Sequence, residues 1–112
     1  AYDLASLLQD IRRVVSPELE AAMIARYIAA RPSIDEAAFR TAYAILAAQR
    51  NIKILGVFTR LYVRDGKPAY PRFHPRLWEL VNANLQHPAL AGVKAWFDAH
   101  VPASARRGVE VK

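Results

Sequence analysis

The chain has 112 residues, of which 54% are hydrophobic and 23% are charged, and its formal net charge is +6. This composition suffices for one packed domain and is unlike that of a disordered chain. The absence of cysteine excludes disulfides and thiolate metal sites, and no apolar run is long enough to predict a transmembrane helix. The first residues, Ala1-Tyr2-Asp3, do not resemble a signal peptide and are typical of a cut inside a longer protein.

The pattern of apolar residues predicts an all-α fold. Apolar residues repeat at helical spacing along most of the chain, and strand-like alternation is nearly absent. Ser16 followed by Pro17 suits the start of one helix, and Ser33-Ile34-Asp35-Glu36 has the pattern of a capping box at the start of another. The predicted helices cover residues 2–13, 17–31, 33–64, 75–85 and 88–100. They form one helical domain over residues 1–102, and residues 103–112 are expected to be a loose tail.

The predicted helix over residues 33–64 is unusually long for a small domain. Its middle is apolar on nearly all sides, in residues 44–48 and again in residues 54–58. A helix that is apolar all round is normally buried, so we expect this to be the central helix of the domain.

Self-contained catalytic and metal-binding motifs are absent from the sequence. The three histidines, His74, His87 and His100, are spaced 13 residues apart and each adjoins a proline or a predicted helix end. No serine lies in a nucleophile elbow, and the four glycines do not form a phosphate-binding loop. We therefore predict no metal site and no catalytic residue within this chain.

A polar patch interrupts the central helix at Gln49, Arg50, Asn51 and Lys53. Arg50 lies on an otherwise apolar row, and an unpaired buried guanidinium is costly, so it must meet a carboxylate, carbonyl groups or a wet cleft. Two interpretations stay open. In one, Arg50 pairs with an internal acid such as Asp3 or Asp10 and the nearby cations are solvated. In the other, a neighbouring row forms a basic stripe that faces a ligand groove, namely Gln49, Lys53, Gly56, Arg60 and Arg64.

Positive charge is concentrated in the middle of the chain. Residues 40–76 carry eight basic side chains and one acidic side chain. Such an imbalance indicates either an anionic partner or a solvated face beside an acidic neighbour in a larger protein.

Three stretches together resemble the C-terminal part of bacterial aminoglycoside-phosphotransferase-like kinases. They are residues 2–10 (YDLASLLQD), residues 49–58 (QRNIKILGVF) and residues 64–70, which begin RDGKP and end in Tyr70. The nearest branch is that of the sugar kinases that phosphorylate N-acetylmuramate and N-acetylglucosamine at the anomeric position. The resemblance covers essentially residues 1–100, and the second stretch is the most specific part.

This resemblance implies the helical C-terminal subdomain of a kinase-like fold in a cytoplasmic enzyme that uses ATP and Mg²⁺. The nucleotide lobe, the catalytic H-x-D loop and the metal-binding aspartate would precede this chain, so the chain alone is expected to be inactive. Asp3 matches an aspartate that holds the catalytic loop by accepting its backbone hydrogen bonds. Parts of the acceptor pocket come from these helices in the family, which makes Gln49, Arg50, Asn51 and Lys53 the candidate pocket wall.

Two other functions remain as alternatives. The basic centre is compatible with a nucleic-acid-binding helical domain, although no helix-turn-helix or base-stacking motif accompanies it. The chain could also be a free-standing helical module that binds another protein. We do not expect the chain to bind a membrane.

Overall fold

The computed structural model describes residues 1–107. That part of the chain is all-helical, which confirms the predicted fold class, and it contains no strand. None of its helices is both long enough and apolar enough to cross a bilayer. The elements in chain order are α1 (Tyr2–Leu8), α2 (Pro17–Ala29), α3 (Glu36–Val63), η1 (Pro71–Phe73), α4 (His74–Asn84), η2 (Pro88–Leu90), α5 (Ala91–His100) and η3 (Ala103–Ala105).

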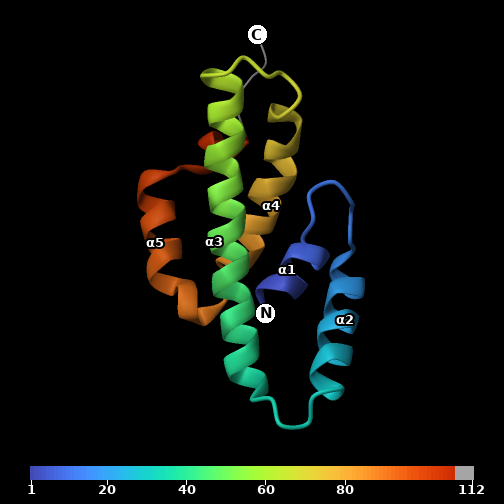
Figure 1. The fold of residues 1–112 in the computed structure, drawn as a ribbon. Coiled ribbons are helices and arrows are strands. Elements are labelled where there is room, and N and C mark those ends of the chain that lie inside the picture. The colour runs from blue at the N-terminus through green and yellow to red at the C-terminus, as the bar shows by residue number, and fades with distance from the viewer. Residues whose placement is uncertain (108–112) are drawn as a thin grey trace.

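Helix α3 is the axis of the fold, as predicted (Figure 1). It runs the length of the molecule, with α4 alongside it, α1 and α2 on one side and α5 on the other. One group of buried side chains joins the C-terminal half of α3 to α4 and η2, and it includes Leu55, Leu77 and Val81. A second group joins the N-terminal half of α3 to α1 and α2, and it includes Ala5 and Phe39. The expectation that α3 is buried on nearly all sides is wrong for one face, because Lys53 and Arg60 on it are exposed.

The first helix is shorter than predicted, since it ends at Leu8 rather than near residue 13. The carboxylate of Asp10 accepts a hydrogen bond from the backbone N–H of Arg12, two residues further on, at 2.8 Å. Such a side-chain turn competes with helical hydrogen bonding and ends the helix. Residues 10–16 consequently form a loop that leads to α2.

The starts of α2 and α3 are both capped by side chains, but only one cap is the predicted one. Ser16 accepts a hydrogen bond from the backbone N–H of Leu19 at 3.1 Å, as expected. At α3 the cap is Asp35, which accepts from the N–H of Ala38 at 3.0 Å, so the predicted cap at Ser33 is wrong. A carboxylate near a helix N-terminus is also stabilised by the helix dipole.

The C-terminal end of α3 turns at Gly66, the one described glycine with a positive φ, of 65°. Its N–H donates to the carbonyl of Tyr62, as in a left-handed helix cap. Beyond α5, residues 103–107 of the predicted loose tail include η3, and Arg106 there donates to the Val101 carbonyl and to Asn82. Residues 108–112 lie outside the described residues.

Candidate functional site

The four candidate residues of the polar patch point in different directions around α3. Gln49 and Lys53 are exposed on one face, together with Arg60. Successive residues of a helix are about 100° apart, so Arg50 is turned to the side and Asn51 to the opposite face. Asn51 is completely buried. The structure therefore does not bring the four into one wall, and of the four only Arg50 lines the groove described below.

Asn51 is the centre of a buried amide cluster. Its side-chain NH₂ group donates to the carbonyl oxygen of Gln9 at 2.8 Å and to that of Asn84 at 3.0 Å. The Asn84 NH₂ group also donates to Gln9, at 3.2 Å. Gln9 and Asn84 are themselves buried. The cluster joins the end of α1 to α3 and α4, and its burial indicates a structural role for Asn51 rather than contact with a ligand.

The cluster continues through a carboxylate to α2. Gln9 donates to the Glu20 carboxylate at 2.9 Å, and the Tyr43 hydroxyl donates to the same oxygen at 2.7 Å. Burial raises the pKa of Tyr43, and the hydrogen bond to Glu20 raises it further. Sequence reasoning missed Gln9 and Glu20, because each looks like an ordinary polar position of an amphipathic helix.

A hollow of about 420 Å³ lies beside this cluster, between α2 and α4. Its lining includes Glu20, Tyr43 and Asn84, with apolar Ile24 and Leu80. A larger hollow, of about 520 Å³, is lined by Gly56, Arg60 and Arg64 of the predicted basic stripe and by His74 and Trp78 of α4.

The groove that contains Arg50 has a volume of about 400 Å³, within the usual range for small-molecule sites. It lies between the loop after α1, the side of α3 and the segment around η1. Its lining residues are Asp10, Ile11, Arg12, Arg50, Ile54, Phe58, Tyr70 and Phe73.

The charged part of the groove holds two cations and one carboxylate. Arg12 donates from its side chain to both carboxylate oxygens of Asp10, at 3.3 Å each. These bonds hold the pKa of the Asp10 carboxyl below its ordinary value, and the charge of Arg50 lowers that pKa further through space. Asp10 is thus paired with Arg12, and the expected internal ion pair of Arg50 with Asp10 or Asp3 is not present within residues 1–107.

The apolar part of the groove is aromatic. The rings of Phe58 and Tyr70 have centroids 4.8 Å apart, and those of Phe58 and Phe73 are 5.8 Å apart. All three rings are partly exposed. A groove lined by cations and by partly exposed rings is suited to a ligand that has both an apolar face and polar groups.

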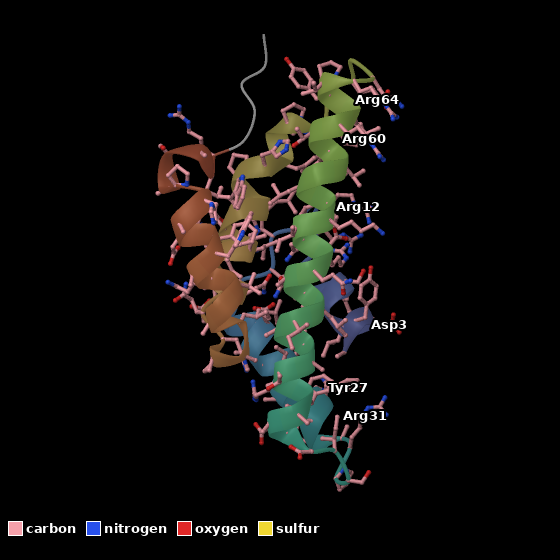
Figure 2. All side chains as sticks on the ribbon, turned by 90° about the vertical axis from the view of Figure 1, so that its left-hand side faces the viewer. Asp3, Arg12, Tyr27, Arg31, Arg60 and Arg64 are labelled. Atoms are coloured by element: carbon pink, nitrogen blue, oxygen red, sulfur yellow. The ribbon has the colours of Figure 1, made fainter. Side chains whose placement is uncertain are left out.

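Asp3 lies in the first turn of α1 and is exposed. Figure 2 shows Asp3, Arg12, Arg60 and Arg64 on the same side of the molecule, so Asp3 and the Arg12 end of the groove face the same way. No hydrogen bond or ion pair to the Asp3 carboxylate occurs among the described residues.

The described residues contain no group of three or more His, Asp or Glu side chains placed to hold a metal ion. Of the histidines, His74 is buried, with its ring nitrogens 2.9 Å from the Thr59 hydroxyl and 3.1 Å from the Pro71 carbonyl oxygen. His87 accepts the N–H of Ala89 and caps η2.

Comparison with known proteins finds kinases of the branch that the sequence motifs indicated. The chain is 54% identical over 107 residues to the N-acetylmuramate/N-acetylglucosamine kinase of Caulobacter vibrioides. It is 37% identical over 83 residues to the protein of that name in Neisseria meningitidis and 38% identical over 55 residues to the one in Pseudomonas putida. The chain is homologous to a C-terminal fragment of these kinases. These matches confirm the resemblance to N-acetylmuramate/N-acetylglucosamine kinases.

The first match includes 96% of this chain but only 30% of the Caulobacter protein, and the other two include 25% and 16% of their proteins. The chain therefore spans less than a third of the length of these relatives. No family model matches the chain.

Replacing Asn51 should show whether it is structural. Asn51→Ala removes both donations and leaves the buried Asn84 oxygen without a donor, while Gln9 still accepts from Asn84, so we expect a loss of about 1–3 kcal/mol in the free energy of unfolding. Gln49→Ala, on the exposed face, should change it by less than about 0.5 kcal/mol. Urea denaturation measures both, and equal effects would contradict the structural role of Asn51.

The Asp10–Arg12 pair predicts a pH-dependent contribution to stability. The pKa of Asp10 is lowered in the folded state from its ordinary 3.8, so its contribution is present above that pH and is lost as the pH falls through the folded value. Because the Arg12 side chain is 79% exposed, we expect less than about 1 kcal/mol. Asp10→Asn should lower the melting temperature at pH 7 and match the unmodified protein near pH 2. A difference that grows on acidification would refute this.

Proposed function

We propose that this chain is the helical C-terminal part of an ATP-dependent sugar kinase that acts on N-acetylmuramate and N-acetylglucosamine. The observation that carries the proposal is the 54% identity to a kinase of that name over 96% of the chain. In this proposal, residues 1–102 form the helical subdomain of an aminoglycoside-phosphotransferase-type fold, and the complete enzyme is cytoplasmic.

The chain supplies no phosphoryl-transfer machinery of its own in this proposal. Phosphoryl transfer needs groups that hold the phosphates, metal ligands and an aspartate that positions the nucleophile. No H-x-D sequence occurs in the 112 residues. The N-terminal lobe and the catalytic segment of the same protein would bind ATP and Mg²⁺, and this chain would be inactive without them.

Asp3 is proposed to support the catalytic loop rather than to act on substrate. An ionised carboxylate is an acceptor only, and its bonds to backbone N–H groups are stronger than neutral ones. Its exposure and its lack of a partner within the described residues leave it free to accept such bonds.

The acceptor sugar is proposed to contact the chain mainly at the groove around Arg50. Asn51 is buried and bonded to Gln9, so we do not expect it to contact the sugar. Its proposed role is to hold in place the elements that form the groove. Gln49 and Lys53 are accessible and are retained as candidates for contacts at the edge of the acceptor site.

A free-standing basic binding module, for an acidic protein or a nucleic acid, is the alternative. Lys53 and Arg60 on α3 favour it, because both cations are exposed and can therefore reach an anionic partner. Binding to duplex DNA or RNA that falls steeply with salt would support this alternative.

The direct test of the kinase proposal is an assay of the full-length protein that contains this segment. We expect ATP-dependent phosphorylation of N-acetylmuramate and N-acetylglucosamine, detected as sugar phosphate by mass spectrometry. A folded full-length protein that phosphorylates neither sugar would overturn the proposal.

Asp3→Ala in that protein should lower kcat by about 10- to 100-fold, the range typical of residues that position a catalytic group. The KM values for sugar and ATP should change little, because Asp3 contacts neither in this proposal. Glu18→Gln is the matched control, since Glu18 is also an exposed acid in the first turn of a helix. Equal kcat for the Asp3 variant and the control would remove Asp3 from this role.

A further inference from the structure

Arg50 is a half-buried cation without a partner. Its Nη1 atom is buried and makes no hydrogen bond, and no ion pair or hydrogen bond from its other nitrogens occurs within residues 1–107. Those other nitrogens are still accessible to solvent, since only Nη1 is enclosed without a partner. A guanidinium carries five N–H donors, and burying it uncompensated is costly. An anion at its open edge would compensate for this cost.

The nearest carboxylate does not supply that anion. Both oxygens of Asp10 accept hydrogen bonds from Arg12, and one of them also accepts the Arg12 backbone N–H at 2.8 Å. No ion pair to Arg50 forms within the described residues. With two cations and one carboxylate, the groove keeps an excess positive charge at Arg50.

The surroundings of Arg50 narrow the class of anion. The rings of Phe58, Tyr70 and Phe73 line the same groove as Arg50. Aromatic rings pack against the apolar C–H faces of a sugar ring, whereas inorganic phosphate has no apolar face to place on them. A monosaccharide that carries a carboxylate satisfies both parts of the groove.

The relatives are named for two sugars that differ in this group. N-acetylmuramate is N-acetylglucosamine with a lactic-acid ether, and this ether adds one carboxylate. Guanidinium and carboxylate match in a planar, two-bond geometry. We propose that Arg50 binds the carboxylate of the acidic sugar, which makes it a specificity-determining residue for N-acetylmuramate over N-acetylglucosamine. This proposal rests on the sugar-kinase function proposed above.

The neutral sugar should depend much less on Arg50. It has no group of opposite charge to place at the guanidinium, and water or a hydroxyl group can occupy that position instead. Loss of Arg50 should therefore change the ratio of the two specificities, while a mutation that only damages the fold would reduce both together.

The test compares kcat/KM for both sugars in the full-length kinase, in the unmodified protein and in Arg50→Met. We expect a decrease of about 10- to 100-fold for N-acetylmuramate and less than about threefold for N-acetylglucosamine, with the KM for ATP unchanged. Arg107→Met is the matched control, because it removes the same charge from an exposed position outside the groove. It should leave the ratio of the two sugars unchanged.

Three outcomes separate this inference from the function on which it rests. Equal losses for both sugars in a folded Arg50→Met protein would overturn the specificity role and leave the kinase function standing. No activity of the unmodified protein on either sugar would overturn the function itself. If Arg50→Met does not fold, Arg50→Lys replaces it. Lysine keeps the charge but not the planar fork, so a selective loss on the acidic sugar supports the proposal and an unchanged ratio refutes it.

Discussion

Asn51 donates two hydrogen bonds in the middle of the longest helix, and the arrangement of the other helices depends on them. The acceptors are Gln9 at the end of α1 and Asn84 at the end of α4. The Asn51 NH₂ group has both its donors bonded, although the Asn51 oxygen is buried without a donor, and the two bonds hold these helix ends in one relative position. Through Gln9 and Glu20 the same constraint extends to α2.

This constraint also shapes the Arg50 groove. Asn51 of α3 bonds to Gln9, and α1 ends just before Gln9. Asp10 and Arg12 of the following loop therefore lie beside α3, where they line the groove with Arg50. Arg50, the residue before Asn51, lines the same groove. One residue of α3 thus holds the helices together from within while the preceding residue faces the space that they enclose.

The sequence was sufficient for the fold class, the central position of α3 and the motifs that identify the family. Helical periodicity and the Ser16-Pro17 pair are local signals, and the structure confirms both. The sequence does not predict that α1 ends at Leu8, because the apolar pattern of a helix continues through Ile11 and the turn at Asp10 competes with it. The cap of α3 was placed two residues early, because Ser33 and Asp35 are both good caps and only the path of the chain chooses between them.

The candidate site was predicted in part. The place of Arg50 among apolar residues predicts that it needs a polar partner. The sequence does not show that Asp10 pairs with Arg12 and not with Arg50, because this pairing depends on the path of the loop after α1. Gln49, Arg50, Asn51 and Lys53 are close together along the chain, but neighbours on a helix face different ways, so the sequence does not show which of them faces a groove. The partners Gln9 and Asn84 lie 42 and 33 residues from Asn51, and no local pattern joins them.

The most direct test of this account is a crystal structure of the full-length protein with N-acetylmuramate and a non-hydrolysable ATP analogue. The account predicts the sugar ring against Tyr70 or Phe73, its carboxylate on the Arg50 guanidinium, and a backbone N–H of the catalytic loop donating to Asp3. A sugar bound in the hollow beside Glu20 and Asn84, with Arg50 left in contact only with protein or solvent, would contradict it.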